Sequence, residues 1–227
     1  MNSALNLSQQ SKIFDPLNAS PVTVIGAGSV GSWVVDILAK LGVGDITVYD
    51  DDGVESHNIA PSAYGQDDIG MYKVTALERL VRAKSGVDLK VIQGKYAGQP
   101  LKGTVIVCVD TMEARKMIWD QVRDNALVDA FIDTRISVEF LSIFALKPCD
   151  LTDKAYYECF MYPSSEANGQ HCGVHSIVFV AVDAANWAVK QLTVHWSGGR
   201  MRPHKRFLAR DFDAEEVVSE EESLVED

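Results

Sequence analysis

A glycine-rich turn between two apolar runs constrains the fold of this chain more than any other feature of its sequence. The run at 22–25 is rich in β-branched residues and leads into the sequence GAGSVG at residues 26–31. Apolar residues then recur at helical spacing from 30 to 41, and a second β-rich run at 46–49 ends at Asp50. This order predicts a buried strand, a tight turn, an amphipathic helix and a second strand, which form a right-handed βαβ crossover.

The following patterns extend this unit into a larger domain. They predict helices and strands after residue 70, then two alternating segments typical of strands, and finally a long apolar helix. In chain order these elements are expected at 71–83 (helix), 89–93 and 105–109 (strands), 112–122 (helix), 131–136 and 139–146 (strands) and 173–192 (helix). We therefore predict an α/β fold: a Rossmann-like, mostly parallel sheet with helices on both faces and additional antiparallel strands in the C-terminal half.

The boundaries of this domain follow from segments without regular periodicity. Residues 147–170 have few periodic signals and predict a long irregular excursion, and long excursions often carry function. Residues 211–227 have too few large apolar groups to offset the entropy of ordering them, so a disordered tail is expected. We divide the chain into an N-terminal segment (1–20), a central domain (21–210) and this tail.

The tail carries most of the formal charge of −11 on the 227-residue chain, because it holds nine acidic residues and no basic one. The remaining residues are nearly neutral, so the acidity argues against general nucleic-acid binding only for the tail; no nucleic-acid partner is expected. A basic cluster precedes the tail, and it is interpreted either as a solvated surface or as a docking patch for an acidic partner. Its residues are Arg200, Arg202, Lys205, Arg206 and Arg210.

Composition also predicts the compartment and the role of the cysteines. The apolar runs fall short of the ~20 residues that span a bilayer. Residues 1–18 lack the pattern of a signal peptide, so we expect a cytoplasmic protein without a membrane segment. The four cysteines form no CxxC pair, which predicts free thiols and no zinc site.

The glycine turn predicts a phosphate-bearing ligand. Gly26 permits the tight turn, Gly28 lets backbone N–H groups approach phosphate oxygens, and Gly31 lets the helix pack closely on the strand. The helix that begins near Ser29 directs the positive end of its dipole at the same place. Asp50 lies nineteen residues beyond the last glycine, where its carboxylate would accept hydrogen bonds from ribose hydroxyl groups. These residues fit NAD and ATP equally.

Three further motifs separate the two nucleotides. They are DDDGVESHN at 50–58, DIGMYK at 68–73 and DTMEAR at 110–115. With the glycine turn, this set resembles the ThiF/MoeB adenylyltransferases and the adenylation domains of ubiquitin-activating enzymes, over roughly residues 20 to 195. The resemblance implies an ATP-dependent enzyme that activates the C-terminal carboxylate of a small ubiquitin-fold or sulfur-carrier protein as an acyl adenylate. It makes the central domain a nucleotide-binding adenylation domain.

The resemblance also implies roles for single residues. Lys73 would contact phosphate, Asn58 would orient it, Asp110 would hold Mg²⁺, and Asp52 would support the site. Each has a structural alternative, since a lysine after a helix start is often solvated and an aspartate after a strand often caps the next helix. We interpret Arg115 as structural, with a direct role as the alternative.

The chain departs from the family pattern at its arginines. Where the family continues to an Arg-Gln pair, this chain has Pro61 and Ser62, and no arginine precedes Arg79. Loss of guanidinium groups removes charge-assisted contacts to the transferred phosphoryl group. Arg135, at the end of an expected central strand, would restore one positive charge. The alternative is a buried pair with Asp133 that braces the sheet.

Two further hypotheses concern covalent chemistry and assembly. Cys172 matches a family cysteine that forms a thioester or persulfide, and the start of the following helix would lower the pKa of its thiol; packing or capping is the alternative. The helix at 173–192 has apolar residues on more than one face, which favours a homodimer as in family members. Two competing functions stay open: a nucleotide-binding partner module without strong catalysis, and an NAD-dependent oxidoreductase.

Overall fold

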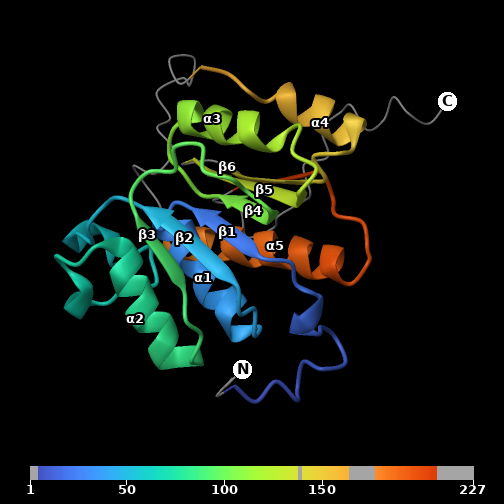
Figure 1. The fold of residues 1–227 in the computed structure, drawn as a ribbon. Coiled ribbons are helices and arrows are strands. Elements are labelled where there is room, and N and C mark those ends of the chain that lie inside the picture. Colours follow the sequence, from blue (N-terminus) through green and yellow to red (C-terminus); the bar gives the residue numbers. More distant parts are fainter. Residues whose placement is uncertain (1–4, 138–139, 164–176, 209–227) are drawn as a thin grey trace.

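One sheet organises the computed structural model, which describes residues 5–137, 140–163 and 177–208. Its strands are β1 (Val22–Ile25), β2 (Ile46–Asp50), β3 (Lys90–Gln93), β4 (Gly103–Val107), β5 (Val128–Ile136), β6 (Phe140–Leu146) and β7 (His204–Leu208). They lie in the order β3-β2-β1-β4-β5-β6-β7. Neighbours are parallel from β3 across to β5 and antiparallel from β5 to β7. This arrangement confirms the predicted Rossmann-like α/β fold with an antiparallel C-terminal half (Figure 1).

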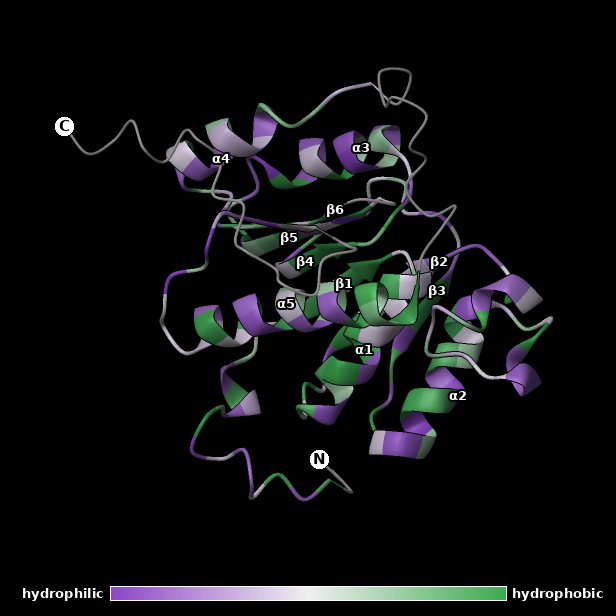
Figure 2. Ribbon diagram, turned by 180° about the vertical axis from the view of Figure 1, so that it is seen from behind, coloured by the Kyte–Doolittle hydropathy of each residue, from purple (hydrophilic) through white to green (hydrophobic). Residues whose placement is uncertain are grey.

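Helices cover both faces of the sheet. They are α1 (Ser29–Lys40), α2 (Lys73–Ser85), α3 (Met112–Val122), α4 (Leu151–Glu158) and α5 (Val178–Trp196). α1, α2 and α5 pack on one face and α3 and α4 on the other, and each face buries its own apolar cluster. Figure 2 shows the hydrophobic strands between these two layers. Among the helices of the described residues, none combines the length and hydropathy needed to cross a membrane.

Some elements differ from those that the sequence predicts. α2 begins two residues late, because Tyr72 forms an isolated antiparallel bridge with Gly53 and the helix then starts at Lys73. The expected irregular stretch contains α4, and the carboxylate of Asp150 caps it by accepting hydrogen bonds from two N–H groups of the first turn. α5 continues to Trp196, beyond the predicted end. The sequence does not predict β7, because this strand lies within the basic cluster, which is interpreted as a solvated surface or a docking patch.

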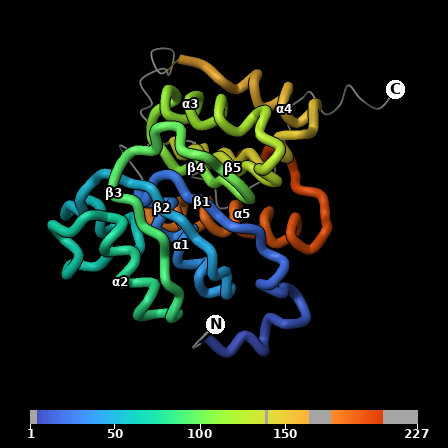
Figure 3. The backbone as a smooth tube through the Cα atoms, viewed as in Figure 1, coloured from blue at the N-terminus to red at the C-terminus, as the bar shows by residue number. Residues whose placement is uncertain are grey.

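The N-terminal segment packs at the edge where the parallel strands begin. The Gln10 side-chain amide donates to the carbonyl oxygen of Leu41 at the end of α1, at 2.8 Å. Phe14 stacks on Trp196, with ring centroids 5.8 Å apart. Figure 3 traces this segment past the C-terminal end of α1. The segment therefore lies at the opposite end of α1 from the glycine turn.

Candidate functional site

The carboxyl ends of the parallel strands bring three predicted segments to one edge of the sheet. Ile25, the last residue of β1, pairs with Tyr49 of β2 on one side and with Val107 of β4 on the other. The glycine turn, Asp50 and the loop that leads to Asp110 therefore start side by side. In open α/β sheets this edge is where ligands bind, so it is the candidate site.

Each glycine of the turn meets a different steric requirement. Gly26 has a φ of +97°, and a Cβ there would lie 2.5 Å from the carbonyl oxygen of Cys108. A Cβ at Gly31 would lie 1.9 Å from the carbonyl oxygen of Gly26, so the helix and the turn leave no room for a side chain. A Cβ at Gly28 would meet nothing within 4 Å. The turn is closed toward the sheet and open at Gly28, as the approach of a phosphate requires.

The start of α1 adds hydrogen-bond donors on the open side. Gly28 is its N-cap and supplies no side-chain cap, and the first turn, which begins at Ser29, holds no acidic residue. Thr111 and Asp150, in contrast, cap α3 and α4 with their side chains. An uncapped helix start presents backbone N–H groups and the positive end of its dipole, which together favour an anion.

Asp50 is held at the base of the turn by two backbone groups. Its Oδ2 accepts a hydrogen bond from the Ala27 N–H at 2.6 Å, and its Oδ1 accepts one from the Asp52 N–H at 2.9 Å. Burial raises the pKa of this carboxyl above its ordinary value, although these hydrogen bonds and the nearby charge of Lys73 oppose the rise. The carboxylate thus has a fixed orientation beside the glycine turn.

Lys73 lies at the same edge and is not a solvated charge. Its side chain is 10% exposed, and its Nζ lies 2.8 Å from Oδ2 of Asp52 and 4.0 Å from Oδ1 of Asp50. The Lys73 N–H also donates to the Asp52 carbonyl oxygen at 2.9 Å. One carboxylate oxygen from each of Asp50, Asp51 and Asp52 lies within 4.8 Å of the other two, so this group could hold a cation. The structure thus brings together Lys73, Asp50 and Asp52.

Asn58 and Asp110 occupy different environments near this edge. The Asn58 Oδ1 accepts a hydrogen bond from the Glu55 N–H at 2.9 Å and so caps a short helical turn. Asp110 is exposed in the loop after β4, and the α3 cap predicted as its alternative role is made by Thr111. The Asp110 carboxylate is therefore accessible. The bond to Glu55 occupies only the Oδ1 acceptor of Asn58, whereas a phosphate oxygen would need its Nδ2–H donors.

The two positions where the family has Arg-Gln contact α1 and the loop itself. The Trp33 Nε1–H donates to the carbonyl oxygen of Pro61 at 3.1 Å. Ser62 is buried, and its hydroxyl donates to the carbonyl oxygen of Asn58 at 2.5 Å. These residues anchor the loop and supply no positive charge.

Tyr64 is a site neighbour that sequence reasoning missed. Its hydroxyl donates to the carbonyl oxygen of Ala27, inside the glycine turn, at 2.6 Å. The side chain is buried, and burial, together with the charges of Asp50 and Asp68, raises the pKa of the phenol well above its ordinary value. Tyr64 is therefore a permanent donor. It stands in a polar segment without periodicity, so the sequence offered little signal for it.

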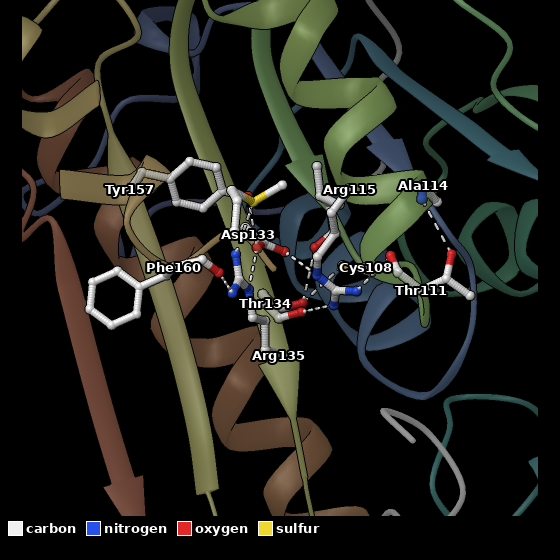
Figure 4. A network of polar contacts seen from close by, with 11 residues as sticks. Cys108, Thr111, Ala114, Arg115, Asp133, Thr134, Arg135, Tyr157 and Phe160 are labelled. Carbon is white, nitrogen blue, oxygen red and sulfur yellow. Dashed lines mark hydrogen bonds and ion pairs between the residues drawn. The ribbon is translucent and has the colours of Figure 1, made fainter. Parts of the chain in front are cut away.

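A buried ionic network lies behind the site, between β5 and the helices α3 and α4 (Figure 4). The fully buried Asp133 carboxylate accepts hydrogen bonds from Arg115 Nε at 2.9 Å, from Arg135 Nε at 2.7 Å and from the Tyr157 hydroxyl at 3.0 Å. Burial alone would raise the pKa of Asp133, but the two guanidinium groups outweigh it and hold the pKa below its ordinary value. Arg115 also donates to the carbonyl oxygen of Thr134 at 2.8 Å, which ties α3 to β5.

Arg135 takes part in this network in the structural role given above as the alternative to catalysis, a buried pair with Asp133 that braces the sheet. Besides Asp133, its guanidinium donates to the carbonyl oxygen of Phe160 at 2.8 Å and lies over the ring of Phe144, 4.5 Å from the centroid. Contact with a nucleotide would require Arg135 to leave these partners, and its catalytic role stays a prediction. Cys172 lies outside the described residues, so its nucleophilic role also stays a prediction.

Comparison with known proteins adds a family to this geometry. The sequence model of the ThiF family matches residues 4–211. Ubiquitin-like modifier-activating enzyme 5 of Drosophila virilis is 31% identical over 136 residues, which cover 51% of this chain and 34% of the relative. The same enzyme of Drosophila mojavensis is 27% identical over the same shares. The chain thus matches about a third of the length of these curated relatives.

Solved structures share the fold at lower identity. PaaA superposes with a TM-score of 0.70 and 19% identity, over 88% of this chain and 64% of PaaA. MccB of E. coli, solved with ATP, gives a TM-score of 0.67 and 15% identity over 88% of this chain and 63% of MccB. These likenesses establish a common architecture.

Proposed function

Because this chain is a member of the ThiF family, we propose that it is an ATP-dependent adenylyltransferase. A carboxylate oxygen of the substrate attacks the α-phosphorus of ATP, the bond to the bridging oxygen of the β-phosphate breaks, and pyrophosphate leaves. The products are an acyl adenylate and pyrophosphate. As substrate we propose the C-terminal carboxylate of a small ubiquitin-fold or sulfur-carrier protein. Support comes from the relatives, which are ubiquitin-like modifier-activating enzymes, and from MccB, which is solved with ATP and with MccA.

One observation carries the proposal: the glycine turn is open at Gly28 and is flanked by Asp50 and Lys73 at the same sheet edge. A nucleotide needs donors for its phosphates, an acceptor for its ribose and a cation to balance charge. The backbone N–H groups at the start of α1 would hold a phosphate, and Asp50 would accept hydrogen bonds from ribose hydroxyl groups. Lys73 would exchange Asp52 for a phosphate oxygen.

Two further predicted residues, Asp110 and Asn58, would complete the nucleotide site. Asp110 would hold Mg²⁺, which when bound neutralises charge on the phosphate oxygens. The exposed carboxylate of Asp110 fits such an oxygen-seeking cation, and the carboxylates of Asp50, Asp51 and Asp52 form a separate group of oxygen ligands. Asn58 would orient the transferred phosphate by donating from Nδ2, while its Oδ1 keeps the hydrogen bond from the Glu55 N–H.

Exchange of labelled pyrophosphate into ATP tests the proposal. The protein is supplied with Mg²⁺ and with candidate ubiquitin-fold partners encoded in neighbouring genes, and exchange should depend on the partner's C-terminal carboxylate. An amidated partner C-terminus is the control, because it removes the nucleophile and leaves the rest of the partner intact. Lys73→Ala and Asp110→Ala should each reduce the exchange. Exchange that is unchanged by both substitutions would contradict the assigned site.

Thermal shift measurements with ATP and with NAD, made beside the exchange assay, separate the alternatives. A thermal shift with ATP but no exchange with any partner would support the partner module, an outcome that Pro61 in place of the family's arginine favours. A larger rise in melting temperature with NAD than with ATP and Mg²⁺ would support an oxidoreductase. Equal exchange by Arg135→Ala and the parent protein would remove Arg135 from catalysis.

We also propose a homodimer. Ile177, Val178 and Phe179 at the start of α5 are exposed apolar residues, which is the kind of surface that a subunit interface covers. Light scattering that gives the mass of one chain across the working concentration range would contradict this assembly.

A further inference from the structure

The glycine turn is held on both sides of Ala27. The Ala27 N–H donates to Asp50, at 2.6 Å, and the Ala27 carbonyl oxygen accepts the hydrogen bond from the Tyr64 hydroxyl, also at 2.6 Å. Ala27 is fully buried and Tyr64 is 4% exposed, so the bond from the Tyr64 hydroxyl is shielded from bulk water. Both peptide planes that meet at Ala27 are therefore fixed in orientation.

The second of these planes bears directly on the open side of the turn. It contains the Ala27 carbonyl group and the Gly28 N–H, which point in opposite directions across a trans peptide bond. Because the Tyr64 hydroxyl fixes the direction of the Ala27 carbonyl oxygen, the Gly28 N–H points in the opposite direction, away from Tyr64. At Gly28 a Cβ would meet nothing within 4 Å, so space for a ligand exists next to this residue.

The loop that carries Tyr64 also holds the first turns of α1. The Ala63 N–H donates to the hydroxyl of Ser32 at 3.1 Å, and the indole N–H of Trp33 donates to the carbonyl oxygen of Pro61 at 3.1 Å. Three hydrogen bonds thus connect residues 61–64 to the turn and to α1. In this stretch the family pattern has an arginine, and this chain has none.

We infer that Tyr64 is a positioning residue for nucleotide binding: by holding the Ala27 carbonyl oxygen it presets the Gly28 N–H toward the phosphate. The inference rests on the proposed function, because it assumes that a nucleotide phosphate occupies the open side of the turn. Preorganised donors bind an anion without the cost of ordering them on binding. Tyr64 itself touches the turn and contributes no group to the ligand.

Tyr64→Phe tests this inference, since it removes one hydroxyl and keeps the buried ring. Tyr96→Phe is the matched control: Tyr96 is 3% exposed, and its hydroxyl donates to a backbone carbonyl oxygen, that of Gln99, at 2.7 Å. Each variant loses one such bond, so both should show a similar small fall in melting temperature. The Kd for ATP with Mg²⁺, measured by calorimetry, should rise about tenfold in Tyr64→Phe, which equals about 1.4 kcal/mol, and stay unchanged in Tyr96→Phe.

The outcomes separate this inference from the proposed function. If the parent protein does not bind ATP, the proposed function fails. If the parent binds ATP and both variants bind it equally well, the inference about Tyr64 fails. In pyrophosphate exchange, Tyr64→Phe should raise the KM for ATP and leave kcat nearly unchanged; a fall in kcat with an unchanged KM would overturn it. If Tyr64→Phe does not fold, Trp33→Phe is measured against the same control. This variant removes the donor to Pro61 and loosens the loop that carries Tyr64, and an unchanged Kd would overturn the inference.

Discussion

Replacing Asp133 with asparagine should remove a large part of the stability of this domain. The Asp133 carboxylate is fully buried and is the shared acceptor of Arg115, Arg135 and Tyr157. Asparagine keeps the shape of the side chain but loses the negative charge, so the buried guanidinium groups of Arg115 and Arg135 lose the charge that compensates them. Breaking a buried ion pair by removing one partner costs about 3–5 kcal/mol, out of a typical total of about 5–15 kcal/mol. We expect the melting temperature to fall by roughly 10 °C.

Denaturation in guanidinium chloride at neutral pH measures this loss. The control is Asp120→Asn, because Asp120 pairs with Lys116 on the surface of α3, with side chains 44% and 65% exposed. Such surface pairs contribute about 0–1 kcal/mol. A loss in Asp133→Asn no larger than that of the control would refute the reasoning. In a double-mutant cycle with Arg135→Met, the double variant should lose less than the sum of the single variants, because one uncompensated charge has then been removed.

The pH dependence of the same comparison has a defined sign. The pKa of Asp133 is lowered in the folded state, while an aspartate in the unfolded chain has a pKa of about 3.9. The stabilisation from its charge is therefore complete above the unfolded pKa and is lost as the pH falls toward the folded pKa. The difference in stability between the parent and Asp133→Asn should be constant near neutral pH and should shrink in acid. A difference that grows in acid would contradict this assignment of charge.

Further predictions concern the glycine turn, the lysine and the tail. Gly28→Ala should keep the melting temperature within a few degrees and weaken ATP binding by about tenfold or more. Gly31→Ala should cost about 3 kcal/mol or more of stability, because its Cβ would lie 1.9 Å from a backbone oxygen. Equal melting temperatures of the two variants would contradict this steric difference. Lys73→Met should lower pyrophosphate exchange by about 10²-fold, and an unchanged rate would place the phosphate elsewhere. Deletion of residues 213–227 should change partner affinity in a salt-dependent way; titration at two ionic strengths measures it, and equal affinities would leave the tail without a role in binding.

Sequence patterns predicted the parts of this fold that depend on local periodicity and backbone geometry. The glycine turn was predictable because Gly26 and Gly31 meet steric limits that other residues cannot meet. α4 was missed although Asp150 is a local capping signal, because its packing depends on an aromatic cluster formed with distant strands. The position of Tyr64 depends on a contact across 37 residues of chain, which no spacing rule encodes.

The same limit applies to charged residues. Lys73 was identified through a motif, but its burial and its bond to Asp52 come from the bridge that turns the chain back beside β2. Arg135 left two open alternatives, because a sequence does not show whether a strand-end arginine faces a ligand or a buried carboxylate. The structure supplies its partners, and they include Asp133 and the carbonyl oxygen of Phe160.

The contact between Trp33 and Pro61 bears on how this chain could diverge or be redesigned. Trp33 binds the main-chain carbonyl oxygen of Pro61, which every amino acid supplies, so an arginine introduced there keeps this anchor. Ser62 differs, because its buried hydroxyl group donates to Asn58 and a glutamine would have to displace that contact. The family residue is therefore easier to introduce at position 61 than at position 62. A single Pro61→Arg substitution would therefore add a family-like positive charge here without removing a side-chain hydrogen bond.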